Sequence, residues 1–214
     1  MYSPEAERKP RGRPRSFDRD QALETAMRLF WSRGYEATSI NDLTKAIGIT
    51  PPSLYGTFGD KRRLFLEAVN RYQEDACHYF GSALTSGLTA EESIRRLMLN
   101  TVDYFTDPKR PTGCMVVLSA TNCGPESSDV VEALADKRRA VAKAIGARIA
   151  AGQKAGELAH GSDLEALGDL VVATYFGLSV NARDGMSRKR LRASVEELMR
   201  LWPRNPNCAL AASE

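Results

Sequence analysis

Residues 39–61 read SINDLTKAIGITPPSLYGTFGDK, and this stretch decides the fold of the N-terminal region. A serine at its start can cap a helix, and apolar residues recur at helical spacing over the next eight positions. Gly48 is suited to end that helix, and Thr50 with Pro51 can begin another, because proline fits the first helical position. Two short helices joined by a glycine-containing turn are typical of a helix-turn-helix, the unit that enters the major groove of DNA.

The second of these helices has an apolar side and a side that is free to contact DNA. Leu54 and Phe58 are four residues apart, so they share the face that packs on the preceding helices. The other face can enter the groove, where hydroxyls donate to base edges or phosphates and proline rings pack on thymine methyl groups. Its residues are Thr50, Pro51, Pro52, Ser53, Tyr55 and Thr57. Lys61 and Ser39 each stand at a helix N-terminus, where we expect them to bind phosphate.

The first 16 residues form a basic, proline-rich arm that is predicted to be disordered without a partner. Within it, the sequence RGRPR at residues 11–15 matches the core of an AT-hook. Glycine lets the backbone lie deep in a narrow minor groove, while Arg11, Arg13 and Arg15 follow the negative potential of that groove. A solubilising tail is the alternative, but the position of the arm next to a helix-turn-helix favours minor-groove contact.

The composition is that of an ordinary globular protein with a basic N-terminal region. Of the 214 residues, 43% are hydrophobic and 27% are charged, and no apolar run is long enough to cross a membrane. The first 70 residues contain 12 Lys and Arg against 9 Asp and Glu, which accounts for the whole net charge of +3. The N-terminus lacks the hydrophobic core of a signal peptide, and the cysteines lack CxxC spacing. We therefore expect a cytoplasmic protein with a polyanionic partner at its N-terminal region.

Capping signals and helical spacing recur along the rest of the chain, so we expect an all-α fold. Helix starts are predicted at Asp18, Asp60, Thr89, Ser162 and Ser187. A long helical pattern covers residues 128–155, and the apolar stretch at 113–123 has no second strand to pair with, which favours a helix there as well. Roughly nine or ten helices and no strand are predicted.

Two segments carry a resemblance to a known family: ALETAMRLFWSRGYEATSINDLTKAIGIT at residues 22–50 and SLYGTFGDKRRLF at residues 53–65. Residues 17–72 closely resemble the DNA-binding domain of the tetracycline-repressor (TetR) family. The resemblance implies an all-helical, dimeric transcription regulator, usually a repressor and not an enzyme. In such proteins a three-helix head binds double-stranded operator DNA, and a larger helical body binds a small-molecule inducer.

The resemblance also implies which residues contact DNA. Four residues fall on positions that usually touch phosphate: Ser39, Thr50, Tyr55 and Lys61. Five fall on the recognition helix: Pro51, Pro52, Ser53, Gly56 and Thr57. Many family members carry His near the position of Gly56, or Lys-Gly in place of the two prolines. The smaller or more apolar side chains of this chain leave few direct hydrogen bonds to bases, which shifts the expected specificity onto the arm and onto DNA shape.

The C-terminal part is expected to form a homodimer. Residues 163–183 are apolar nearly all round, and Gly168, Ala173 and Gly177 are small enough for close helix approach. By resemblance, the last two long helices build a four-helix interface with their two-fold mates, whereas periodicity alone equally fits monomer core. A two-fold dimer would place two recognition helices about 34 Å apart and require a near-palindromic operator.

These expectations divide the chain into four parts. They are a basic arm at 1–16, a helix-turn-helix DNA-binding domain at 17–77, a ligand-binding and dimerisation domain at 78–204, and a frayed tail at 205–214.

A ligand pocket is expected among the middle helices of the body, although each candidate residue can also be plain core. The candidates are Met98, Val102, Tyr104, Phe105, Cys114, Met115, Leu118, Tyr175 and Phe176. Their mixture of apolar and aromatic side chains suggests an apolar or aromatic ligand. One or two hydrogen-bonding groups on that ligand could be met by Tyr104, Tyr175 or Asn122.

Several alternatives compete with an organic ligand. Cys114 and Cys123 could form a thiol switch that senses oxidants or electrophiles, or they could be small buried hydrophobes. His78 and His160, the only histidines, show no ligand spacing to the cysteines, so we expect neither metal nor cofactor. No sequence motif of an enzyme is present. A constitutive, architectural DNA binder is the remaining alternative, suggested by the AT-hook-like arm.

Overall fold

The computed structural model describes residues 17–85 and 87–207, and it confirms the predicted all-α class. Within those residues the only strand-like pairing is an isolated bridge between Leu158 and Arg204. The predicted arm, and the part of the predicted tail beyond residue 207, lie outside the described residues.

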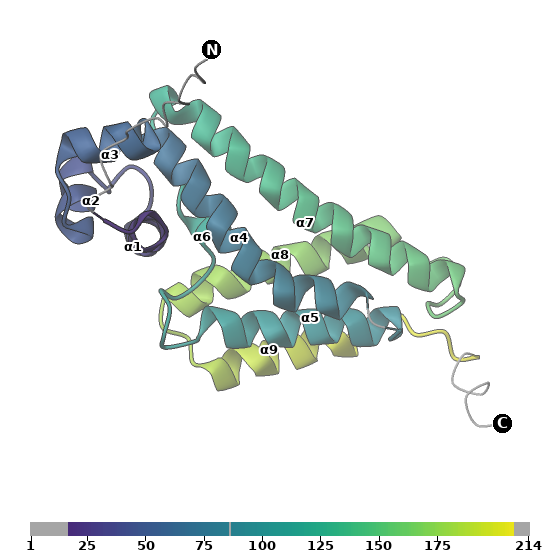
Figure 1. Ribbon diagram of the computed structural model, residues 1–214. Helices are drawn as coiled ribbons and strands as arrows, with labels where there is room; N and C mark the ends of the chain where they lie inside the picture. Colours follow the sequence, from purple (N-terminus) through teal and green to yellow (C-terminus); the bar gives the residue numbers. More distant parts are fainter. Residues whose placement is uncertain (1–16, 86, 208–214) are drawn as a thin grey trace, which may run out of the picture.

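Three helices form a head at one end of the molecule (Figure 1). They are α1 (Arg19–Arg33), α2 (Ile40–Ile47) and α3 (Pro51–Phe58). α2 and α3 are joined at Gly48, whose left-handed conformation (φ 79°, ψ 33°) favours glycine. The described helices therefore include the helix-turn-helix that the sequence predicts.

The body contains the remaining helices of the described chain. They are α4 (Lys61–Thr85), α5 (Ala90–Phe105), the four-residue α6 (Met115–Leu118), α7 (Ser128–Lys154), α8 (Leu164–Arg183) and α9 (Arg188–Arg200), with a short 3-10 turn at Pro125–Ser127. α4 starts in the head and continues across the predicted domain boundary at residue 77, while α7 extends from the head side to the far end (Figure 1). None of the described helices is long and apolar enough to cross a membrane.

Helix starts follow the capping signals of the sequence with two corrections. Thr89 and Glu92 form the reciprocal capping box predicted for α5, and Asp18 accepts from the first backbone N–H groups of α1. α8 is capped by Asp163 and not by Ser162, because the Asp163 carboxylate accepts from the Ala166 N–H. Thr50 precedes α3 but makes no side-chain cap bond.

Aromatic side chains fasten the head to the body. Phe30 of α1 is fully buried and meets Phe65 of α4 edge-on, with ring centroids 5.0 Å apart. Trp31 packs in the same way on Tyr72, at 4.7 Å. These contacts lie on the first half of α4, so α4 is part of both the head and the body.

Candidate DNA interface and effector pocket

The exposed face of α3 contains most of the residues predicted to contact DNA. Leu54 and Phe58 are buried against the rest of the head, as their spacing predicts. On the opposite side Tyr55 is 48% exposed, which is unusual for a large aromatic side chain and leaves it free to contact a partner. Thr50, Pro51, Pro52 and Gly56 are also exposed, and Ser53 and Thr57 are half-buried.

The hydroxyl groups at the start of α3 are paired with each other. Thr50 Oγ1 and Ser53 Oγ lie 3.0 Å apart and share one hydrogen bond, so one hydroxyl proton remains for a phosphate or base acceptor. At Gly56 an added Cβ would meet no atom within 4 Å, so this position presents bare backbone to a partner. α3 thus offers few side-chain donors and a close backbone approach.

Two predicted phosphate contacts are already engaged within the head. Ser39 Oγ donates to Asp42 Oδ2 at 2.5 Å, and the Ser39 backbone N–H donates to the same carboxylate. These hydrogen bonds lower the pKa of Asp42 and keep it ionised. The Lys61 ammonium lies 4.3 Å from the centre of the Tyr35 ring, and Nζ is 3.5 Å from the Glu36 carbonyl. Both residues would have to exchange these partners to bind phosphate.

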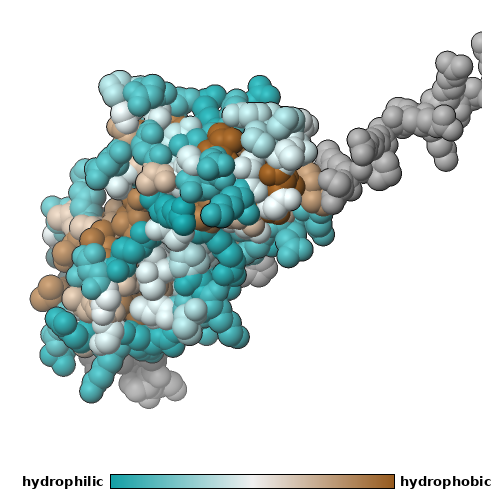
Figure 2. All heavy atoms as spheres, turned by 90° about the vertical axis from the view of Figure 1, so that its left-hand side faces the viewer, coloured by the Kyte–Doolittle hydropathy of each residue, from teal (hydrophilic) through white to brown (hydrophobic). Residues whose placement is uncertain are grey.

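Lys45 is a cation near α3 that was not among the predicted DNA contacts. It is exposed on α2 and lines a surface hollow together with Asn41, Thr50 and Ser53. The sequence could have indicated this residue, because Lys45 lies off the apolar face of the helix at residues 40–47. Arg11, Arg13 and Arg15 lie outside the described residues. Seen end-on, the head presents a mostly hydrophilic surface (Figure 2).

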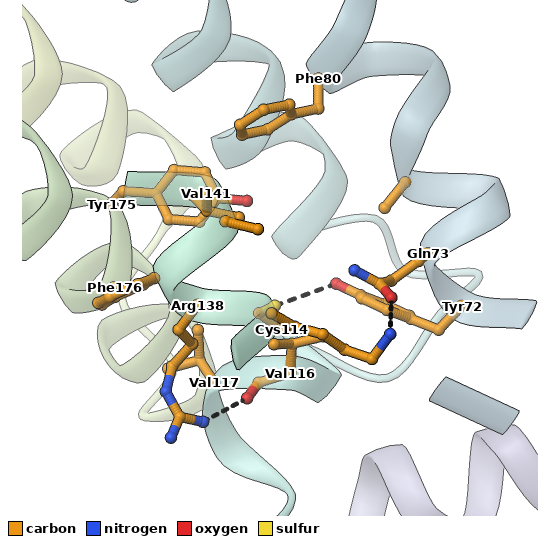
Figure 3. Close-up of a pocket in the computed structure, with 13 residues that line it drawn as sticks. Tyr72, Gln73, Phe80, Cys114, Val116, Val117, Arg138, Val141, Tyr175 and Phe176 are labelled. Carbon is orange, nitrogen blue, oxygen red and sulfur yellow. Dashed lines mark hydrogen bonds between the residues drawn. The ribbon is translucent and has the colours of Figure 1, made fainter. Parts of the chain in front are cut away.

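A cavity of about 210 Å³ lies in the body between α4, α6, α7 and α8. Aromatic rings form much of its wall, with Phe80 and Tyr175 on one side and Tyr72 on the other (Figure 3). The lining residues are Tyr72, Gln73, Ala76, Phe80, Cys114, Val116, Val117, Lys137, Arg138, Ala140, Val141, Tyr175 and Phe176. Its mostly apolar lining with a few polar groups is typical of a small-molecule site.

The structure brings only three of the nine predicted pocket residues to this cavity: Cys114, Tyr175 and Phe176. The other six do not line it, and neither does Asn122. Met98, Val102, Phe105 and Met115 are instead fully buried core, while Tyr104 and Leu118 are partly buried against that core. The sequence does not predict the walls from α4 and α7, because their apolar positions have the same spacing as ordinary core.

Cys114 lines the cavity and is hydrogen-bonded to both α4 and α8. The Tyr72 hydroxyl donates to Cys114 Sγ at 3.3 Å, and the Cys114 backbone N–H donates to Ser179 Oγ of α8 at 2.7 Å. Burial raises the pKa of the Cys114 thiol, and burial followed by the negative charge of Glu36 raises that of Cys123. Both cysteines are free thiols, and their surroundings favour the less nucleophilic protonated form.

Two cations line the cavity. Lys137 Nζ donates to Asn70 Oδ1 at 2.9 Å and to Gln73 Oε1, and Arg138 Nη1 donates to the Val116 carbonyl at 3.0 Å. No cluster of three or more His, Cys, Asp or Glu side chains suited to a metal ion occurs in the described part of the chain.

Comparison with known families places this architecture in one class. Residues 22–68 match the family described as bacterial regulatory proteins, tetR family. Residues 90–189 match the tetracyclin repressor-like C-terminal domain. The head and the body are therefore both those of a helix-turn-helix transcription regulator.

Similar proteins extend the match over nearly the whole chain. The HTH-type transcriptional repressor ComR of Escherichia coli is 32% identical over 197 residues, covering 92% of this chain and 94% of ComR. The repressor BdcR of the same organism is 27% identical, with 86% and 88% covered. A cysteine-substituted form of the TetR family regulator CifR, solved with a 26-base-pair operator duplex, is 43% identical, with a TM-score of 0.86 and coverage of 90% of this chain and all of that one.

The chain belongs to the TetR family. It is a DNA-binding transcriptional repressor and not an enzyme, as the sequence predicts.

Proposed function

We propose that this repressor binds a palindromic operator as a two-fold dimer and releases it when a small apolar or aromatic effector enters the cavity. One observation carries the proposal: the cavity lies directly against α6, and the segment around α6 is hydrogen-bonded to α1 and to the turn that follows it in the head. Val116 and Val117 of α6 line the cavity. At the end of that segment, the Ser119 carbonyl accepts from the Tyr35 N–H at 2.7 Å.

A second bond connects the other end of the α6 segment to the head. Trp31 Nε1 donates to the Gly113 carbonyl at 3.1 Å, in a buried environment. Gly113 has φ +80°, and a Cβ there would lie 2.8 Å from the Ser179 carbonyl oxygen of α8. A displacement of α6 by an effector would therefore act on α1 and on α8 together.

Such a coupling changes DNA affinity through the spacing of the two heads. An effector that binds better to one arrangement of the body shifts the population toward it, by no more than its difference in affinity for the two arrangements. If that arrangement holds the recognition helices at a separation other than one DNA turn, both heads cannot enter successive major grooves.

The dimer is supported by the outer face of α8. Leu170 is 43% exposed and Val180 is 44% exposed, on a helix whose other face is buried in the body. Hydrophobic side chains gather at the left edge of Figure 2, on the side of the body where Figure 1 draws α8 behind α4 and α5. Ala173 and Gly177, also on α8, are small enough for a second helix to approach closely.

The other candidate functions have less support. The thiol switch at Cys114 and Cys123 is disfavoured by the raised pKa of both thiols. An architectural DNA binder would not need a cavity connected to its head. Because a bacterial repressor must bind chromosomal DNA, we expect this protein in the cytoplasm.

Filling the cavity tests the proposal. Ala76 lines the cavity from α4, so Ala76→Phe should exclude an effector, whereas Ala147→Phe on the exposed side of α7 should not. A panel of small aromatic compounds would be screened for release of operator DNA by fluorescence anisotropy. We expect the compounds that release the wild type to fail only on Ala76→Phe, with each variant compared against its own DNA affinity in the absence of compound. Equal release from both variants would show that the effector binds elsewhere.

A further inference from the structure

Lys137 stands out among the groups that line the cavity because its charge has no opposite charge beside it. Its ammonium donates to two neutral amide oxygens, those of Asn70 and Gln73 on α4. Across the described residues, no carboxylate lies within ion-pair distance of Lys137 or of its neighbour Arg138. On the same helix, Glu132 and Asp136 are both paired with Arg139.

The acidic residues of α4 near this wall also form ion pairs with another residue. Glu74 and Asp75 lie 3.4 Å and 3.2 Å from Arg71 Nη1. Burial lowers the pKa of Lys137, in keeping with an ammonium that has only neutral amide partners. An anion placed in the cavity would supply the missing opposite charge, and its binding would restore the Lys137 pKa upward.

The rest of the cavity limits what that anion can be. Its 210 Å³ is smaller than the roughly 300–1,000 Å³ of sites for drug-sized ligands, so the ligand is small. Tyr72, Phe80, Tyr175 and Phe176 supply aromatic walls that favour a flat, apolar body. In Figure 3, the amide nitrogen of Gln73 faces the cavity, while its oxygen is turned to the dashed hydrogen bond.

We propose that the cavity takes a small aromatic carboxylate, with its ring between the aromatic walls and its carboxylate on Lys137 Nζ and the Gln73 amide. Arg138, which donates to Val116 of α6, adds a second positive charge at the same wall. This inference rests on the proposed effector site and specifies its ligand class. Because Lys137 and Arg138 are neighbours on α7 and Arg138 donates to the Val116 carbonyl of α6, a displacement of α7 by the bound anion would act on the segment bonded to the head.

Matched acids and amides test the charge without changing the shape of the ligand. Benzoate, phenylacetate and 3-phenylpropanoate would each be compared with the corresponding primary amide, by calorimetric titration into the full-length protein without DNA. At least one acid should bind about tenfold or more tightly than its amide, as expected for a charge-assisted hydrogen bond.

Variants of Lys137 identify the group responsible. Lys137→Met should lower the affinity for the acid to that of the amide, and Lys137→Arg should restore most of it, because guanidinium keeps the charge. Lys143→Met is the matched control, since Lys143 is on the same helix but exposed and does not line the cavity. Its affinity for the acid should equal that of the wild type.

The outcomes separate this inference from the proposed function. Equal affinity for acid and amide, an unchanged affinity in Lys137→Met, or no binding of any of the three acids at millimolar concentration would each overturn it. If neutral compounds release operator DNA while these acids do not bind, the effector function stands and the carboxylate inference fails. If an acid binds through Lys137 but leaves operator binding unchanged, the carboxylate inference stands and the effector function fails.

Discussion

At the level of single residues, Leu54 and Tyr55 are neighbours on α3 but face different sides of the helix. Leu54 is fully buried and holds the helix on the head, whereas Tyr55 next to it is 48% exposed. An aromatic side chain that contributes little to the core is available for contact with a partner, and its hydroxyl can donate to a DNA phosphate. The sequence predicts both roles, because four-residue spacing to Phe58 identifies the buried side.

Replacing Tyr55 should separate binding from stability. We expect Tyr55→Ala to weaken operator binding about tenfold, since a hydrogen bond to a charged phosphate is lost, while the melting temperature stays nearly unchanged. Leu54→Ala should instead lower the free energy of unfolding by about 2–5 kcal/mol. Anisotropy titrations and thermal unfolding of both variants measure this. A stable Tyr55→Ala protein with wild-type affinity would remove Tyr55 from the interface.

At the level of elements, local signals and tertiary contacts differ in how well the sequence predicts them. The capping box at Thr89 and Glu92 is local, so it is predicted correctly. The cavity is not local, because its walls come from α4, α6, α7 and α8. Lys137 in particular has the sequence context of a solvent-exposed lysine, and only the packing of α7 on α4 brings its ammonium to Asn70 and Gln73.

Two glycines provide a matched test of the α6 segment. Gly113→Ala should lower the free energy of unfolding by at least about 1–3 kcal/mol, because alanine is strained at φ +80° and its Cβ would approach the Ser179 carbonyl. Gly146→Ala lies inside α7, where an added Cβ meets nothing within 4 Å. It should raise stability by about 0.5–1 kcal/mol. Urea unfolding of both variants measures these changes in free energy. An unchanged free energy of unfolding in Gly113→Ala would mean that the α6 segment is not tightly packed against α8.

At the level of the whole molecule, the exposed apolar face of α8 is the surface that the proposed dimer would bury. The double variant Leu170→Glu with Val180→Glu should be monomeric, because two charges would be buried without partners in the two-fold interface. Ala151→Glu, on the exposed side of α7, should leave the dimer intact. Light scattering after size-exclusion chromatography gives the mass directly. A dimeric double variant would place the interface on another face.

The proposed dimer would also determine the form of the operator, which the sequence of one chain implies only through the family resemblance. Two recognition helices related by a two-fold axis contact half-sites about one helical turn apart. Because α3 has few side-chain donors, we expect DNA shape and the basic arm to contribute to specificity. Deleting residues 1–15 should accordingly reduce both operator affinity and its dependence on salt concentration, measured by anisotropy across a salt series.

Footprinting on DNA selected from random sequence by the full-length protein tests the central claim most directly. An effector-controlled dimer should protect a single palindrome whose half-sites are centred about 10 base pairs apart, or a multiple of that spacing. Protection should disappear with the monomeric α8 variant. Dispersed protection of A·T-rich DNA, unchanged in that variant, would contradict the account and support an architectural DNA binder.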